Sequence, residues 1–190
     1  SNLRSSIGGA DYIVITHDDF YSQALKLADW RQQDSRFGEH LKTTVVKITS
    51  IYDEFAWGLF DPTAIRDFLK YSFERWDPKP RYVVLLGNGY YDFKNNSNTS
   101  PNNWLPPYES GDNEGFTTDD WFTYFDNSNL MNMAIGRLPV SSPQEAEIAV
   151  DRIIEYEKNP ERGFWRNTVL LVGDDELVLG GVGNEIDYTV

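Results

Sequence analysis

Short runs of β-branched and other apolar residues alternate along this chain with segments whose apolar residues recur at every third or fourth position. The first pattern is typical of β-strands and the second of amphipathic helices. The strand pattern occurs at residues 12–16, 43–48, 82–87, 133–137 and 168–173. Because strands and helices alternate, we expect an α/β, Rossmann-like fold, with a mainly parallel sheet of about five strands and helices on both faces.

Local signals mark the sheet centre and the starts of two helices. Residues 82–87 are apolar on both faces, which is typical of a central parallel strand. Asp61 and Pro62 suit a helix start, because aspartate accepts from free amide groups and proline fits the first helical position. Ser142-Pro143-Gln144-Glu145 has the pattern of a capping box. We also expect Asp19 to cap the helix that follows the first strand.

Composition excludes several classes of function. The chain has 190 residues and a net charge of −13, which repels phosphates and argues against nucleic-acid binding. No apolar run approaches the roughly 20 residues of a membrane span. There is no cysteine, so disulfides, thiolate metal sites and a cysteine nucleophile are excluded within these residues.

Parallel sheets bind ligands beyond the carboxyl ends of their strands. The polar residues expected at that edge are His17, Asp18, Asn88, Arg137, Asp174 and Asp175. His17 is interpreted either as a general base oriented by a carboxylate or as a turn histidine near a helix cap. Because no nucleophile lies beside it in the sequence, the second interpretation is favoured.

Two further functions remain open from the residues themselves. Acidic residues such as Asp119, Asp120 and Asp126 could hold Mg²⁺ or Ca²⁺, as in a metal-dependent phosphotransfer or hydrolase domain. The long loop over residues 88–120, with the residues just after it, carries an aromatic cluster between residues 104 and 125: Trp104, Tyr108, Phe116, Trp121, Phe122, Tyr124 and Phe125. Its rings form either a binding platform, which would make the chain a binding module, or an anchor that holds the loop to its own sheet.

An ordered series of motifs resembles one family. It includes DYIVITH at 11–17, IYDEFAWG at 51–58, DPTAIRDF at 61–68, LLGNGYYDF at 85–93 and AIGRLPV at 134–140. Shorter matches lie at 28–31, 106–108, 118–122, 165–167 and 172–175. In this order the motifs resemble gingipain-type cysteine peptidases, most closely the branch that acts as the sortase of the type IX secretion system. The resemblance implies a bacterial protein that is secreted or at the cell surface and acts on polypeptides.

The resemblance also implies a division of labour. Residues 1–190 would be the first, α/β subdomain, and a caspase-like subdomain with the catalytic His and Cys is expected after residue 190. That subdomain would be the partner of this one in the same parent chain. His17 does not match the family's catalytic His, so no catalytic residue is transferred to this sequence. The parent is expected to be a cysteine peptidase, and these 190 residues alone are expected to be inactive.

Two sites follow from the resemblance alone. Calcium is known in relatives, and the resemblance to one of them implies a site with a carboxylate at the position of Asn88 and further ligands from a segment that corresponds roughly to Phe125–Asn132. Asparagine removes a charge from that set, and Asp126 could compensate for it. In arginine-specific relatives an acidic residue near the end of this region reaches the specificity pocket, and Glu185 and Asp187 lie near that position.

Overall fold

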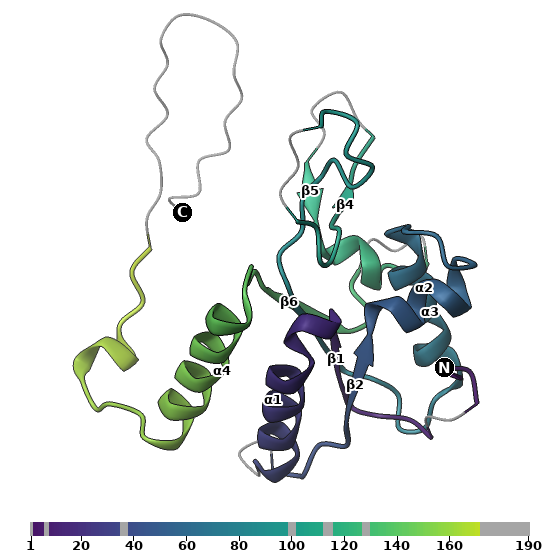
Figure 1. The fold of residues 1–190 in the computed structure, drawn as a ribbon. Helices are drawn as coiled ribbons and strands as arrows, with labels where there is room; N and C mark the ends of the chain where they lie inside the picture. The colour runs from purple at the N-terminus through teal and green to yellow at the C-terminus, as the bar shows by residue number, and fades with distance from the viewer. Residues whose placement is uncertain are drawn as a thin grey trace, which may run out of the picture.

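The computed structural model describes residues 2–5, 8–34, 38–98, 102–111, 116–126 and 130–171. Its centre is a four-stranded sheet in the order β2-β1-β3-β6. The strands are β1 (Tyr12–Thr16), β2 (Thr43–Lys47), β3 (Tyr82–Leu86) and β6 (Ala134–Leu138). All neighbouring pairs are parallel, which confirms the expected α/β architecture (Figure 1).

Among the described residues the sheet has four strands, one fewer than expected. Residues 168–171 form no strand, and Val169, Leu170 and Leu171 are 81, 83 and 87% exposed. A short 3₁₀ helix, η3 (Phe164–Asn167), follows α4 and leads this segment away from the sheet (Figure 1). Apolar patterning reports strand propensity, but a strand also needs a neighbouring strand, which propensity cannot supply. Residues 172 and 173 of the expected strand lie outside the described residues.

Helices cover both faces of the sheet, as expected. The helices α1 (Tyr21–Gln33) and α4 (Pro143–Lys158) lie on one face, and α2 (Ile48–Phe55) and α3 (Thr63–Arg75) on the other. Alternate residues of β1 supply the two cores: Ile13 and Ile15 pack with α2 and α3, while Tyr12 and Val14 pack with α1 and α4. In the described part of the chain no helix is both long and apolar enough to cross a membrane.

Two of the three expected helix caps are present, and the third is wrong. The Glu145 amide donates to Ser142 Oγ at 3.2 Å, as the capping box predicts. The Asp61 carboxylate accepts the Thr63 amide at 2.9 Å at the start of α3. Asp19 does not cap α1, because residues 18–20 form a separate 3₁₀ turn, η1 (Asp18–Phe20), whose cap is His17.

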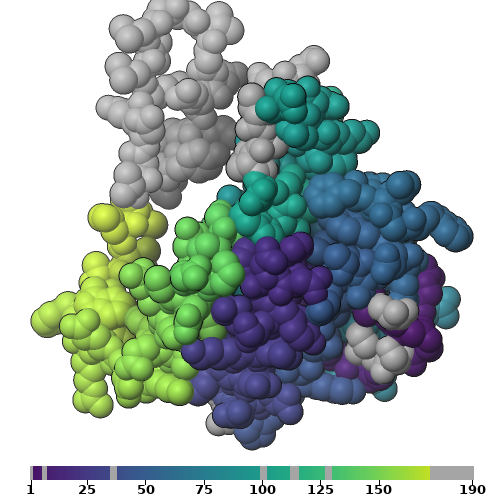
Figure 2. Space-filling view, viewed as in Figure 1, coloured from purple at the N-terminus to yellow at the C-terminus, as the bar shows by residue number. Residues whose placement is uncertain are grey.

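A long excursion, residues 88–120, leaves the sheet after β3. It carries a small antiparallel pair, β4 (Tyr108–Glu109) and β5 (Thr117–Thr118), and leads into η2 (Asp120–Thr123). Figure 2 shows it in teal, standing above the body of the domain beside the blue α2–α3 segment. The Trp121 ring stacks on Tyr108 at 3.8 Å, and Phe122 is fully buried. These rings therefore anchor the excursion to the domain.

Candidate functional site at the carboxyl edge of the sheet

The parallel register gathers several predicted polar residues at one edge. Thr16, Leu86 and Leu138 are aligned across β1, β3 and β6. His17 and Asp18 follow the first of these strands, and Asn88 follows the second. Arg137 is the last residue but one of β6. The prediction that these four residues share the carboxyl edge is confirmed. Asp174 and Asp175 lie outside the described residues.

His17 acts at this edge as a helix cap. Its Nδ1 accepts the Asp19 amide at 3.2 Å, and the same atom lies 3.4 Å from the Asp19 carboxylate. That carboxylate also accepts the Trp104 indole N–H at 3.2 Å, and Asp18 pairs with Lys47 at the end of β2. The hydrogen bond to Asp18 raises the pKa of Lys47. The histidine and its two acidic neighbours thus hold local structure together, as the turn interpretation expected.

Asn88 fastens the start of the excursion. Its amide donates to the Val140 carbonyl at 2.8 Å, and its side-chain Nδ2 donates to Ser141 Oγ at 3.2 Å. Its side-chain oxygen accepts the Gly89 amide at 2.9 Å. Its own carbonyl accepts the amides of Trp104 and Leu105. Asn88 therefore ties β3, the segment after β6 and the far side of the excursion to one point.

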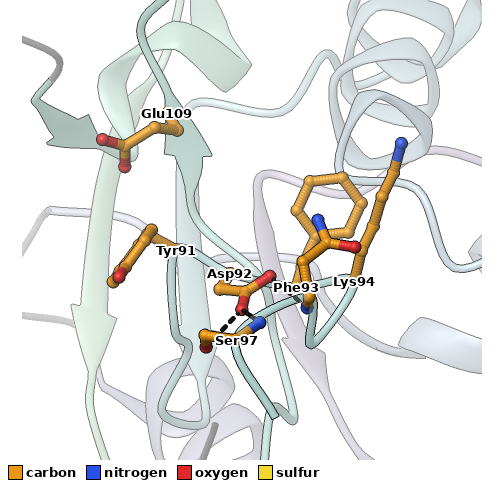
Figure 3. A pocket seen from close by; sticks show the side chains of 7 residues that line it. Tyr91, Asp92, Phe93, Lys94, Ser97 and Glu109 are labelled. Atoms are coloured by element: carbon orange, nitrogen blue, oxygen red, sulfur yellow. Dashed lines mark hydrogen bonds between the residues drawn. The ribbon is translucent and has the colours of Figure 1, made fainter. Parts of the chain in front are cut away.

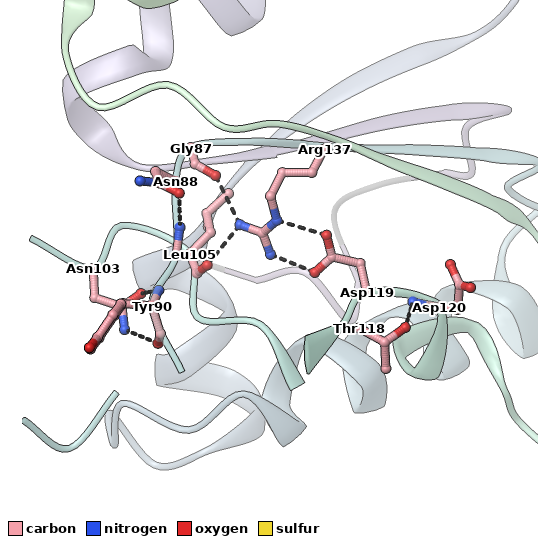
Figure 4. A network of polar contacts seen from close by, with 10 residues as sticks. Gly87, Asn88, Tyr90, Asn103, Leu105, Thr118, Asp119, Asp120 and Arg137 are labelled. Carbon is pink, nitrogen blue, oxygen red and sulfur yellow. Dashed lines mark hydrogen bonds and ion pairs between the residues drawn. The ribbon is translucent and has the colours of Figure 1, made fainter. Parts of the chain in front are cut away.

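Arg137 also attaches the excursion to the sheet, through its guanidinium group (Figure 4). Its Nε and Nη2 donate to the two carboxylate oxygens of Asp119, each at 2.7 Å, in a bidentate ion pair. Its Nη1 donates to the Gly87 carbonyl at 2.9 Å and the Leu105 carbonyl at 2.8 Å. The Arg137 and Asp119 side chains are only 14 and 21% exposed. One guanidinium thus joins β6, the end of β3 and two parts of the excursion.

Gly89 allows the backbone to pack closely at this point. A Cβ at residue 89 would lie 2.0 Å from the Leu105 carbonyl oxygen, so any other residue displaces the backbone. Next to it, the Tyr90 amide and carbonyl form reciprocal hydrogen bonds with the Asn103 side chain, at 3.2 and 2.8 Å. The base of the excursion is therefore packed against itself and the sheet.

The structure does not bring the four expected calcium ligands together. Asn88 follows the end of β3, whereas Asn132 precedes the start of β6, which is aligned with the start of β3. At about 3.3 Å per residue, the five-residue β3 alone separates these ends by about 13 Å. Calcium ligands lie about 2.3–2.6 Å from the ion, so two of them cannot be so far apart. Asn88 and Asn132 therefore do not lie together in this structure, and calcium binding by the chain stays a prediction.

The remaining expected ligands lie with Asn132 near the amino edge. The Asn132 amide and side chain both donate to the Thr123 carbonyl, at 3.1 and 3.2 Å. Phe125 packs on Phe73 near the end of α3, with ring centroids 5.5 Å apart, and Asp126 is exposed. Within the described ranges no three or more His, Cys, Asp or Glu side chains form a group that could hold a metal. Glu185 and Asp187 lie outside the described residues.

Sequence reasoning placed Arg137 at this edge but missed its partner. The sequence indicated Asp119 only as a possible Mg²⁺ or Ca²⁺ ligand, although an arginine on an otherwise apolar strand indicates a buried hydrogen-bond acceptor nearby. The ion pair spans eighteen residues, so no local pattern reports it.

Comparisons with known proteins agree with the fold and its topology. The family model for peptidase family C25 matches residues 6–189. The crystal structure of dimeric latent PorU from Porphyromonas gingivalis is 28% identical, with a TM-score of 0.69, covering 90% of this chain and 17% of that one. The Arg-specific cysteine proteinase gingipain R (RgpB) of the same organism is 21% identical, with a TM-score of 0.56, over 82% of this chain and 30% of that one.

The likeness to RgpB shows the fold alone, and a search of curated proteins finds no match. The chain spans less than a third of the length of these solved relatives. The family model, by contrast, covers almost every residue of this sequence. The chain therefore belongs to peptidase family C25, the gingipain-type peptidases.

Proposed function

We propose that these 190 residues form a non-catalytic α/β subdomain of a gingipain-like cysteine endopeptidase. The observation that carries the proposal is the absence of cysteine from a chain of this family. A cysteine peptidase needs a thiolate nucleophile with a histidine base beside it. The sequence has no cysteine, and both of its histidines contact local backbone: His17 caps η1, and His40 Nδ1 lies 3.1 Å from the Gln32 carbonyl oxygen.

In this proposal the chemistry belongs to a caspase-like subdomain of the same parent chain. Its Cys would attack the scissile carbonyl, its His would take the thiol proton, and backbone N–H groups would hold the oxyanion. The subdomain described here would form a wall of the substrate cleft. The hydrogen bonds of Asn88 and Arg137 support this role, because they join the ends of β3 and β6 to the excursion at the carboxyl edge of the sheet.

We extend the proposal to the whole protein. Its substrate would be a polypeptide, and it would act outside the cell or at the cell surface, as the resemblance to gingipains implies. The identity with PorU favours the sortase branch over a general peptidase.

The purified 190-residue chain tests the proposal directly. It should hydrolyse no fluorogenic peptide after successive ion-exchange and size-exclusion steps. Activity that coelutes with the chain and disappears in a His17→Ala variant would refute the proposal, because contaminating peptidases would not respond to that change.

The alternative functions receive less support. In a phosphotransfer domain the acids of the edge would converge on a metal, but Asp119 pairs with Arg137, and Asp18 with Lys47. For an aromatic platform the rings between residues 104 and 125 would face solvent. Most of these rings pack against the two cores instead, and among the described rings between residues 104 and 125 Phe116 is the most exposed, at 61%.

A further inference from the structure

Trp57, at the end of α2, combines two unfavourable properties. The residue is 95% exposed, although tryptophan is on average highly buried in folded proteins. Its φ angle is +57°, in the left-handed region that costs non-glycine residues energy. Trp57 follows the C-cap Ala56, a position at which helices favour glycine or asparagine. Neither packing nor backbone geometry explains tryptophan here.

Further apolar side chains follow Trp57 in the sequence and lie in the excursion beside them, and we term this set the Trp57 patch: Trp57, Leu59, Phe60, Tyr91 and Phe93. Leu59 is 66% exposed, and Phe60 and Tyr91 are also exposed. The Phe60 and Phe93 rings lie 6.2 Å apart and join the turn after α2 to the excursion. Two segments distant in sequence thus meet at these two rings, and each contributes exposed apolar side chains.

The patch continues into an open pocket of about 500 Å³. Figure 3 shows Tyr91 and Glu109 on one side of it, Phe93 and Lys94 on the other, and Asp92 with Ser97 between them. The Asp92 carboxylate accepts the Ser97 hydroxyl at 2.6 Å and the amides of Asn96 and Ser97. These hydrogen bonds lower the pKa of Asp92 below its ordinary value.

Four acidic residues lie near members of the patch in the sequence or line its pocket. Asp53 reaches within 3.9 Å of a Cβ at Gly58, Asp61 adjoins Phe60, and Asp92 and Glu109 belong to the pocket. Against these carboxylates the pocket presents one basic side chain, Lys94. The whole chain carries a net charge of −13. The ligand that complements this surface is apolar and positively charged.

We propose that the Trp57 patch and its pocket bind a polypeptide segment that carries both apolar and basic side chains. An exposed tryptophan surrounded by other apolar side chains is typical of the residues that dominate protein–protein binding. The acidic surroundings disfavour nucleic acid and anionic lipid, because both carry negative charge. The proposal concerns binding alone and is independent of whether these 190 residues hydrolyse peptides.

Three fluorescent peptides separate the contributions to binding: alternating leucine and lysine, alternating leucine and glutamate, and alternating serine and lysine. Fluorescence anisotropy with the 190-residue chain measures each affinity. We expect the leucine–lysine peptide to bind at least about tenfold more tightly than the other two. Trp57→Asn should weaken its binding by about tenfold or more, because asparagine tolerates the left-handed backbone but removes the ring.

Phe164→Ala is the matched control, because Phe164 is 94% exposed but lies in η3, outside the patch. Its affinity should stay within about twofold of the unmodified chain. Leu59→Ser, at a residue without a left-handed φ angle, should reproduce the loss seen for Trp57→Asn. Circular dichroism checks that each variant is folded.

Three results would overturn the proposal. The first is an affinity for the leucine–lysine peptide that neither Trp57→Asn nor Leu59→Ser changes. The second is equal binding of all three peptides. The third is Trp57-dependent binding to phosphatidylglycerol vesicles with no binding to the peptides, which would make the patch a membrane contact.

Discussion

Replacing Arg137 by alanine tests whether the edge of the sheet is held as described. The substitution removes both charge-assisted hydrogen bonds to Asp119 and the donor shared by the Gly87 and Leu105 carbonyls. It leaves a carboxylate that is only 21% exposed without its counter-ion. We expect the variant to fold, but with a weakened attachment of the excursion, residues 88–120.

The cost follows from the burial of the pair. Removing one partner of a buried ion pair costs about 3–5 kcal/mol, and the remaining exposure of Asp119 favours the lower end of that range. We therefore expect the free energy of unfolding to fall by about 3 kcal/mol. For a chain of this length, about 2–4 °C of Tm corresponds to each kcal/mol, so Tm should fall by about 6–12 °C.

Urea unfolding followed by tryptophan fluorescence measures this loss, with Arg81→Ala as the matched control. Arg81 also pairs with two acids, Asp11 at 3.3 Å and Glu39 at 2.7 Å, but its side chain is 44% exposed. Because water screens such a pair, its loss should cost less than about 1 kcal/mol. Limited proteolysis should cut the excursion faster in Arg137→Ala than in Arg81→Ala.

A double-mutant cycle of Arg137→Ala with Asp119→Ala isolates the pair itself. We expect a coupling free energy of about 2 kcal/mol, since the two side chains share two short hydrogen bonds. Equal costs for the two arginine variants, or a coupling below about 0.5 kcal/mol, would refute the reasoning.

Tyr52→Phe should raise the unfolding free energy by about 1 kcal/mol, because the buried Tyr52 hydroxyl has no hydrogen-bond partner in the described structure. Burial also raises the pKa of Tyr52 in the folded state. Above about pH 10 the Tyr52 hydroxyl therefore ionises in the unfolded state first, which should destabilise the unmodified chain as the pH rises. The urea midpoint of Tyr52→Phe should accordingly fall less steeply with pH than that of the unmodified chain. Trp57→Asn should stabilise the chain by about 1 kcal/mol in thermal melts, and a loss of similar size would show that the ring packs in solution. Gly89→Ala should cost about 2 kcal/mol or more, because its Cβ meets the Leu105 carbonyl, and an unchanged Tm would contradict that contact.

Elements whose determinants are local were predictable from the sequence. The β-branched run at residues 12–16 forms β1 with the expected bounds, and the capping box at Ser142 starts α4. The parallel order then places the carboxyl edge, and with it His17, Asn88 and Arg137. Helix α2 was missed because it follows β2 directly, with no glycine or proline between them to mark the change.

Features that depend on distant contacts were not predictable. The segment at residues 168–171 has strand-like composition but no strand beside it among the described residues. The family resemblance implied that the expected calcium ligands lie together, yet the length of β3 separates Asn88 from Asn132. The Trp57 patch joins a helix end to the excursion through the rings of Phe60 and Phe93, and its tryptophan would ordinarily be expected in the core.

Covalent labelling of the active parent protein tests the central proposal most directly. A peptidyl chloromethyl ketone alkylates the active-site residues of cysteine peptidases, and peptide mapping by mass spectrometry then locates the adduct. We predict an adduct on a cysteine outside these 190 residues, with inhibition proportional to labelling. Stoichiometric, inactivating modification of His17 or any other residue within this chain would contradict the assignment of a non-catalytic subdomain.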